Sequence, residues 1–187
     1  MNVWNLIYSD VCRYIDHGEF KNVKLNKTGK LNIFINALFS RHHCVSFLFW
    51  LRILGSDDYP PLSPMRLLAR YKYRCLRNKY GLQIPPSCSI GPGLYIGHGI
   101  GIVVNSKTKI GSRCNLMHHV TIGSNYHTPA TIGDNVWIGP NVCIVEDVKI
   151  GNNVKIGAGT VVINDIPDNA TSVGNPNRII IKAHEQL

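Results

Sequence analysis

An aliphatic residue recurs at every sixth position from Ile84 almost to the end of the chain, and a glycine usually follows it. A period of six matches neither an α-helix, with about 3.6 residues per turn, nor a strand, with about two, so it indicates a structural repeat. The repeating positions are Ile84, Ile90, Ile96, Val104, Ile110, Leu116, Ile122, Ile132, Ile138, Ile144, Ile150, Ile156 and Val162.

This repeat predicts a stack of triangular coils. Three hexads make one coil, each hexad supplies a short strand and a corner, and the aliphatic residue points inward. Only the stacked coils bury enough surface to be stable. Residues 84–187 are therefore predicted to form a left-handed parallel β-helix, an exception to the usual right-handed crossover. We expect glycine to follow the aliphatic residue because the corner needs backbone angles that a side chain resists.

Residues 1–83 are predicted to form an α-helical N-terminal region. Apolar residues at helical spacing predict a helix near 3–14 and one or two helices within 32–54. A further helix is expected over 64–80, because proline favours a helix start and Gly81 a helix end. We expect the apolar stripe of this last helix to pack on the first coil and cover its open edge. The stripe consists of Leu67, Leu68, Tyr71, Cys75 and Leu76.

Positive charge gathers in the helical region. Residues 1–83 hold 13 Lys and Arg against 5 Asp and Glu, whereas residues 84–187 hold 7 against 6. A basic amphipathic helix fits an anionic membrane or an acidic glycan, with a merely solvated face as the open alternative. No nucleic-acid-binding motif accompanies the charge, so nucleic acid is not an expected partner.

The six cysteines are scattered, without the spacing of a disulfide framework, and the first residues show no signal peptide. We therefore expect a cytoplasmic protein, with peripheral contact at the inner face of the membrane left open. The longest apolar run, within 45–54, is too short to span a bilayer.

Two insertions interrupt the repeat, and each carries a histidine. One lies between Ile96 and Val104 and contains His98, and the other lies between Ile122 and Ile132 and contains His127. An insertion in a coil must bulge outward, and function concentrates in such departures from a regular scaffold.

The chain resembles the hexapeptide-repeat acyltransferases, within them the serine acetyltransferase branch, and most closely relatives from polysaccharide biosynthesis. The matching strings are IPPSCSIGPGLYIGHGIGIVVN, NLMHHVTIG, YHTPATIGDNVWIGPNVCI, IGNNVKIGAGTVV and VGNPNRII. The resemblance implies an acetyl-CoA-dependent acetyltransferase that forms a homotrimer, with active sites between adjacent coil domains. Whether trimers pair further through the helical region is left open.

The resemblance also implies roles for residues of the two insertions. His98 falls on the family's general-base histidine and His127 on its second active-site histidine. Gln83 and Tyr126 stand where the family has an acid and an arginine, and Gly97 stands where it has a second acid. His98 and His127 form the expected catalytic pair, and Gln83, Tyr126, His118 and Asn105 form the expected substrate-binding set.

Further residues are expected to bind CoA along the groove between two coil domains. Small residues at Gly139, Gly157 and Ala158 expose backbone to the pantetheine arm, and Trp137 is a candidate wall. Beyond the last coil, Arg178 and Lys182 are candidate partners for the CoA phosphates. Corner geometry alone is the alternative explanation for the glycines, and a solvated tail for the two cations.

No metal is expected. Related zinc enzymes of this fold pair one histidine with another five residues on, and neither His118 nor His119 has such a partner.

The leading hypothesis is O-acetylation of a sugar hydroxyl of a surface polysaccharide or its precursor, by direct transfer without an acyl-enzyme. An amino-acid acceptor would need the carboxylate and the arginine that Gln83, Gly97 and Tyr126 replace. The alternatives are a serine O-acetyltransferase of cysteine biosynthesis and a non-enzymatic scaffold.

Overall fold

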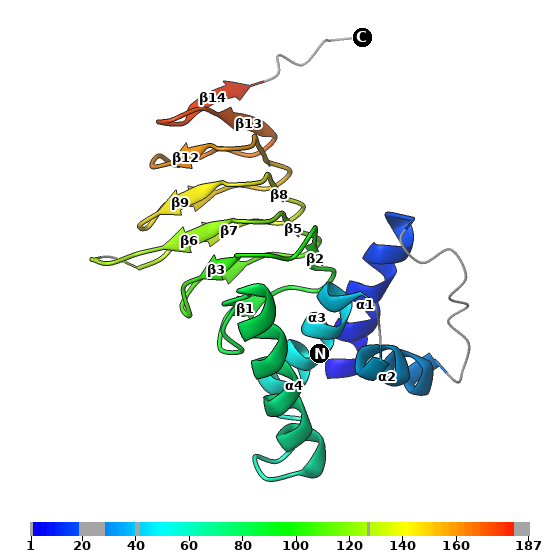
Figure 1. Ribbon diagram of the computed structural model, residues 1–187. Coiled ribbons are helices and arrows are strands. Elements are labelled where there is room, and N and C mark those ends of the chain that lie inside the picture. The colour runs from blue at the N-terminus through cyan, green and yellow to red at the C-terminus, as the bar shows by residue number, and fades with distance from the viewer. Residues whose placement is uncertain (1, 19–28, 40–41, 127, 182–187) are drawn as a thin grey trace.

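The computed structural model describes residues 2–18, 29–39, 42–126 and 128–181. Helices gather at one end and a stack of β-coils rises from them (Figure 1). The helices are α1 (Val3–Asp16), α2 (Gly29–Phe39), α3 (His43–Gly55) and α4 (Pro64–Tyr80). The predicted parallel β-helix with a helical N-terminal region is confirmed.

Short strands build three faces of a prism, and within each face the coils pair in parallel register, one repeat per coil. Face 1 contains β1 (Ser89–Ile90), β4 (Lys109–Ile110), β7 (Thr131–Ile132) and β10 (Lys149–Ile150). Face 2 contains β2 (Tyr95–Ile96), β5 (Asn115–Leu116), β8 (Trp137–Ile138), β11 (Lys155–Ile156), β13 (Ala170–Val173) and the antiparallel β14 (Arg178–Ile181). Face 3 contains β3 (Val103–Val104), β6 (Thr121–Gly123), β9 (Cys143–Val145) and β12 (Val161–Val162).

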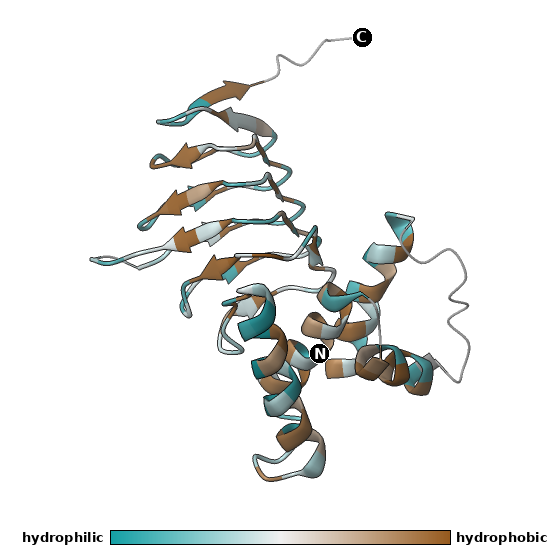
Figure 2. Ribbon diagram, viewed as in Figure 1, coloured by the Kyte–Doolittle hydropathy of each residue, from teal (hydrophilic) through white to brown (hydrophobic). Residues whose placement is uncertain are grey.

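The sixth-position aliphatic residues line the interior of the prism, as predicted, and all except half-buried Ile90 are at most 3% exposed. A second interior row lies two positions before them, and from Thr108 onward it consists of smaller side chains. Its members include Thr108, Cys114, Val120, Ala130, Val136, Val142, Val148, Val154 and Thr160. Figure 2 shows the resulting apolar strands repeated from coil to coil. Burial of both rows between stacked coils is the main source of stability here.

The predicted reason for the repeated glycine is wrong. Gly91, Gly133 and Gly139 do not have a positive φ; a Cβ at Gly91 would instead lie 2.7 Å from the backbone carbon of Gly111 in the next coil. Close approach of stacked coils therefore selects glycine there. The left-handed corner positions are filled mainly by Asn and other polar residues, with Asn135 at φ 55° and Asn153 at φ 57°. Asparagine tolerates this region better than most side chains do.

The helical predictions agree with α1, with α2 and α3 as two separate helices, and with α4, which Ser63 caps at its start and left-handed Gly81 at its end. The predicted stripe of α4 is wrong for three residues, because Leu67, Tyr71 and Cys75 are exposed. Ala69 and Tyr73 are buried instead.

The helix α4 turns a different side to the core than its apolar stripe predicts, because Tyr73 anchors it to the segment that enters the β-helix. The Tyr73 hydroxyl donates a hydrogen bond to the carbonyl oxygen of Ile84 at 2.8 Å, and its ring stacks on Phe47 of α3. The residue before Ile84, Gln83, forms a parallel bridge with Val103 and so begins face 3. These contacts, and not hydrophobicity alone, decide which residues of α4 are buried.

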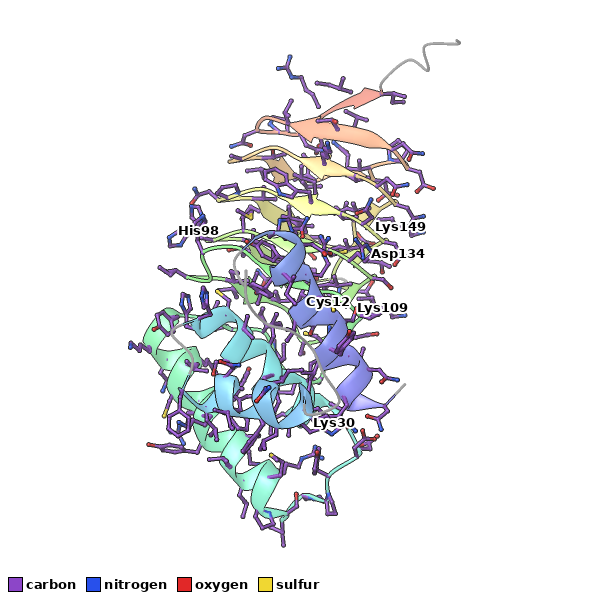
Figure 3. All side chains as sticks on the ribbon, turned by 90° about the vertical axis from the view of Figure 1, so that its right-hand side faces the viewer. Cys12, Lys30, His98, Lys109, Asp134 and Lys149 are labelled. Carbon is purple, nitrogen blue, oxygen red and sulfur yellow. The ribbon has the colours of Figure 1, made fainter. Side chains whose placement is uncertain are left out.

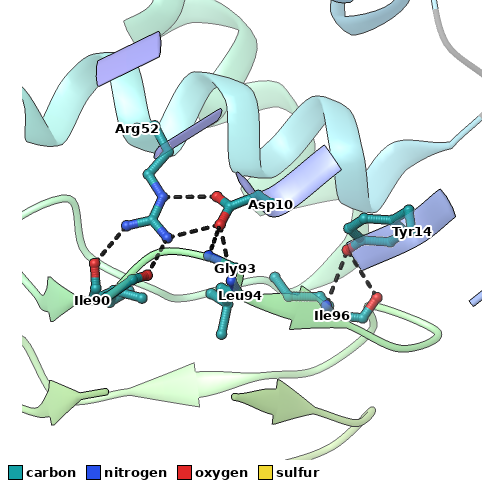
Figure 4. A network of polar contacts seen from close by, with 8 residues as sticks. Asp10, Tyr14, Arg52, Ile90, Gly93, Leu94 and Ile96 are labelled. Carbon is teal, nitrogen blue, oxygen red and sulfur yellow. Dashed lines mark hydrogen bonds and ion pairs between the residues drawn. The ribbon is translucent and has the colours of Figure 1, made fainter. Parts of the chain in front are cut away.

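A buried ion pair joins the helices to the first coil (Figure 4). The Arg52 guanidinium on α3 donates to both carboxylate oxygens of Asp10 on α1, at 2.8 and 3.0 Å. Arg52 also donates to the carbonyl oxygens of Ile90 and Gly91, and the amides of Gly93 and Leu94 donate to Asp10. Charge and hydrogen-bonding capacity are thereby matched, as a buried pair requires. We call this network the helix–coil clamp.

Nearby, the Tyr14 hydroxyl of α1 donates to the carbonyl oxygen of Ile96 and accepts from its amide, so α1 lies along the lower part of face 2. Among the described residues, no helix is long and apolar enough to cross a membrane.

Candidate active site

Five of the predicted site residues stack along one edge of the prism. This edge, the 2–3 corner, joins face 2 to face 3 and comprises residues 97–102, 117–120, 139–142 and 157–160. Backbone hydrogen bonds connect its successive turns: His119 N to Ile100 O at 2.9 Å, Asn141 N to His118 O at 3.1 Å, and Gly159 N to Pro140 O at 2.8 Å. His98, His118, Gly139, Gly157 and Ala158 therefore lie in consecutive coils of one corner.

The imidazole of His98 is exposed at the first turn of this corner, on the opposite side of the prism from Lys109 and Asp134 (Figure 3). Its backbone has φ 54°, the left-handed conformation that the corners of the coils adopt repeatedly. No carboxylate among the described residues hydrogen-bonds to this ring.

The helices support the loop of His98 through His43, a residue that the sequence analysis did not single out. The Nε2 of His43 donates to the carbonyl oxygen of Gly99 at 3.1 Å, and its ring stacks on Tyr80 at 4.0 Å between ring centroids. Burial lowers the pKa of His43 below its ordinary value of 6.5. Since a carbonyl only accepts, Nε2 carries the proton of a neutral ring.

His118 is the neighbour of His98 across one coil. Their ring centroids lie 5.8 Å apart and the ring planes are nearly perpendicular, at 78°. The Nδ1 atom of His118 is buried and has no hydrogen-bond partner among the described residues. The adjacent His119 is exposed. Of the two consecutive histidines, His118 is thus the one that contacts the candidate base.

The positions expected to carry acids in an amino-acid site are arranged differently. Gln83 is exposed on face 3 beside Val103 and makes no described hydrogen bond to His98. A Cβ at Gly97 would lie 2.7 Å from Cε of Met117, so any side chain there would have to displace that methionine. The space beside His98 is therefore filled by a thioether and not by a carboxylate.

The second insertion leaves the prism at a different edge, the 3–1 corner, which joins face 3 to face 1. Asn105 lies at this corner, and its Nδ2 donates to the carbonyl oxygen of Ser124 at 3.5 Å. Tyr126 is 87% exposed, and His127 lies outside the described residues. Within one copy of the chain, face 3 therefore separates Asn105 and the second insertion from His98.

Glu146 holds the start of this second insertion, although nothing in the sequence singled it out. Its carboxylate accepts hydrogen bonds from the Ser124 hydroxyl at 2.8 Å and from the amides of Asn125 and Tyr126 at 3.2 and 3.4 Å. Glu146 itself has φ 61°. A carboxylate that accepts backbone amides makes charge-assisted bonds, so it fixes the loop strongly.

The proposed CoA-binding residues divide into three groups. Ala158 is exposed on the 2–3 corner, and its amide bonds to no described residue, so it can serve a ligand. For Gly139, corner geometry alone suffices, because a Cβ there would lie 2.8 Å from the Ile156 carbonyl oxygen. Gly157 is similarly restricted by the Cγ1 atom of Val173, at 2.9 Å. Trp137 lies on face 2, where it lines a hollow of about 430 Å³ with Asn115, Asn135, Asn153 and Lys155.

The expected phosphate partner Arg178 lies far from His98. Arg178 is exposed on β14, which is five strand spacings from β2 on face 2, or about 24 Å. Lys182 lies outside the described residues. The structure therefore does not bring Arg178 together with His98 and His118 within one copy of the chain.

A cysteine nucleophile is not favoured. Burial raises the pKa of Cys114 and of Cys88 to about 11, so both are thiols near neutral pH. Among the described residues, no group of three or more His, Cys, Asp or Glu side chains is arranged to hold a metal ion.

Comparison with known proteins identifies the repeat. Residues 129–164 match the family model described as bacterial transferase hexapeptide (six repeats). The chain is 34% identical over 125 residues to a serine acetyltransferase of Helicobacter pylori, covering 62% of this chain and 70% of that protein. It is 39% identical over 105 residues to a probable serine acetyltransferase of Oryza sativa subsp. japonica, covering 54% of this chain and 35% of that protein. The chain spans about a third of the length of this and several other curated relatives.

Comparison with solved structures also finds similarity to serine acetyltransferases. The structure of soybean serine acetyltransferase complexed with serine matches with a TM-score of 0.64 and 28% identity, covering 95% of this chain and 69% of that one. These comparisons do not support the expected closeness to polysaccharide-biosynthesis relatives, since they name serine acetyltransferases.

Proposed function

The chain belongs to the hexapeptide-repeat acyltransferases, in their serine acetyltransferase branch, and we propose that it transfers the acetyl group of acetyl-CoA to a hydroxyl oxygen. The observation that carries this proposal is the exposed imidazole of His98 on the same corner as Ala158, whose amide is unbonded within the described chain. A base and a backbone donor thus lie along one edge, where a thioester arm can reach both.

The proposed reaction needs no covalent enzyme intermediate. His98 takes the proton of the acceptor hydroxyl as its oxygen attacks the thioester carbonyl, because an alcohol is a poor nucleophile near neutral pH. The C–S bond then breaks, and the imidazolium returns the proton to the departing thiolate. His118 contacts the His98 ring and helps to hold its orientation.

We further propose that the site is completed by a second copy of the chain. His98 lies at the 2–3 corner, whereas Asn105 and the loop anchored by Glu146 lie at the 3–1 corner. A cyclic homotrimer that packs the 2–3 corner of one copy against the 3–1 corner of the next would bring both sets together at three equivalent sites. His127, which the resemblance makes the second active-site histidine, is proposed to help place the acceptor there.

L-serine is the first acceptor to test, since the matched relatives are serine acetyltransferases. A sugar hydroxyl is the second candidate, and two observations favour it. Met117 fills the space at Gly97, and Gln83 supplies no charge for an ammonium group. A neutral acceptor would not need that charge, whereas an amino acid would.

Release of free CoA thiol from acetyl-CoA tests the proposal, first with L-serine and then with a panel of nucleotide sugars and oligosaccharides. We expect acetyl transfer to one of these acceptors. We also expect His98→Ala to lower kcat by about 10²- to 10⁴-fold with acetyl-CoA affinity retained. His17→Ala, which changes an exposed histidine just after the end of α1, serves as the matched control. Equal activity of His98→Ala and wild type would contradict the proposal.

A further inference from the structure

The helix α4 carries four arginines around a hollow outside the candidate active site. Arg66, Arg70, Arg74 and Arg77 line this hollow of about 610 Å³ together with Asn78. The spacing of three and four residues places them on neighbouring turns of one helical side. Tyr73, Leu54 and Pro86 complete the wall. We call this feature the arginine hollow.

One of the four guanidinium groups is fixed in place by the protein itself. Arg66 donates to the carbonyl oxygens of Ser56, Tyr59 and Leu54, at 3.0, 2.8 and 3.1 Å. Carbonyl groups satisfy its N–H donors without cancelling its charge. Its Nε atom is buried and has no partner among the described residues. The base of the hollow is therefore a preorganised positive charge.

The charge of the hollow is not balanced by acids. Its lining contains no Asp or Glu, and no ion pair to Arg70, Arg74 or Arg77 occurs within the described ranges. Like charges on neighbouring helical turns repel one another and weaken the helix. An anion bound among them would remove this repulsion.

We propose that the arginine hollow binds a phosphate or diphosphate group. Guanidinium groups are planar forks that match phosphate oxygens two at a time, and several of them together suit a group that carries more than one negative charge. The hollow is open to solvent, so a phosphate group can approach the guanidinium groups directly. This site goes beyond the proposed acetyl transfer and does not depend on it.

The phosphate can come from a soluble ligand or from a lipid headgroup. Beside the arginines, α4 exposes Leu67 and Tyr71, and the preceding turn exposes Leu62, at 47%, 66% and 79%. Apolar side chains next to a cationic site are typical of surfaces that contact lipid. The experiment must therefore include both sources.

The test uses the full chain at low ionic strength with two probes. Inorganic pyrophosphate is titrated by calorimetry, and vesicles of phosphatidylcholine with or without phosphatidylglycerol are tested by co-sedimentation. The variant combines Arg70→Gln with Arg74→Gln. The control combines Lys72→Gln with Lys79→Gln, which removes the same charge from the same helix outside the lining of the hollow. Thermal unfolding verifies that both variants fold.

We expect the arginine variant to bind at least about tenfold more weakly than wild type, since hydrogen bonds to charged groups are strong, and the lysine control to bind as wild type does. Loss of pyrophosphate binding supports a soluble phosphate ligand, and loss confined to the anionic vesicles supports a lipid headgroup. The proposal would be overturned if wild type bound neither probe, or if the lysine control were weakened as much as the arginine variant.

Discussion

The contact between His118 and His98 is a ring contact and not a hydrogen bond, because the buried Nδ1 of His118 has no partner among the described residues. We therefore predict that His118→Phe retains most of kcat, since it keeps a ring beside His98. His118→Ala should lower kcat by about tenfold, because small misplacements of a base are costly. The KM for acetyl-CoA should stay unchanged in both variants, as steady-state kinetics would show.

The free energy of unfolding tests the role of His118 independently of its kinetics. Replacing a buried, unsatisfied nitrogen by apolar atoms of similar shape is neutral or stabilising. His118→Phe should therefore unfold in denaturant with a free energy equal to that of wild type or about 1 kcal/mol higher. A clear loss of kcat in His118→Phe would instead assign the imidazole nitrogen a chemical role.

His43 predicts a dependence of stability on pH. Burial lowers its pKa in the folded state, so the unfolded chain binds more protons as the pH falls below 6.5. Its contribution to stability is complete above 6.5 and is lost as the pH falls through the folded-state value. Between about pH 8 and about pH 5, wild type should lose more thermal stability than His43→Phe, which keeps the stacking on Tyr80 but cannot titrate.

Some functional residues could be predicted from the sequence and others could not. The insertion that carries His98 was visible because it broke a strict repeat, and the structure confirms that it projects from a corner of the prism. His43 and Glu146 were not visible, since their importance lies in partners about 56 and 20 positions away. Periodicity reports inward and outward positions but says nothing about such contacts.

At the scale of elements, the helix–coil clamp fixes α1 and α3 to the first coil. Removing one partner of a buried ion pair leaves the other charge uncompensated. Asp10→Asn should therefore lower the free energy of unfolding by about 3–5 kcal/mol in denaturant titration. Asp16→Asn changes an exposed carboxylate of the same helix and should cost less than about 0.5 kcal/mol. Similar values for the two variants would contradict the clamp.

The loop that Glu146 anchors gives a prediction for the acceptor side. Glu146→Gln replaces an acceptor of three hydrogen bonds by an amide that satisfies fewer of them. The KM for the acceptor should rise by about tenfold while that for acetyl-CoA stays constant. Asp147→Asn, at the exposed neighbouring position, is the control. An equal rise in both KM values would argue against a role confined to the acceptor.

The elements themselves could be predicted to a large extent, but their rotation could not. The ends of α4 followed from Pro64 and Gly81, whose backbone preferences are local. Its buried side did not follow, because the bond from Tyr73 to Ile84 turns the helix and leaves Leu67 exposed. Local propensity determines where a helix begins and ends, while tertiary contacts decide which side is covered.

At the scale of the whole molecule, the two separated corners predict complementation between copies. Neither His98→Ala nor His127→Ala should be active alone. Mixed trimers of the two variants would contain some sites with both wild-type histidines, about a quarter of all sites for random cyclic assembly. Co-expression should therefore restore up to about a quarter of wild-type activity. Failure to restore any activity in mixed oligomers would place the whole site within one copy.

The prism as a whole was predictable because its period is strict and each coil repeats the same contacts. The second interior row, from Thr108 to Thr160, was also present in the sequence, two positions before each aliphatic residue. What the repeat could not supply was the function of α4, whose arginines belong to no periodic pattern of the coils.

The helices that cover the first coil also limit how copies can aggregate. A bare coil end would offer unpaired strand edges to another stack, so that solenoids could polymerise end to end as fibrils do. Here Arg52 occupies the carbonyl groups of Ile90 and Gly91, and Asp10 occupies the amides that follow them. A chain with this clamp disrupted should therefore form fibrous aggregates through its first coil before it loses the rest of the stack.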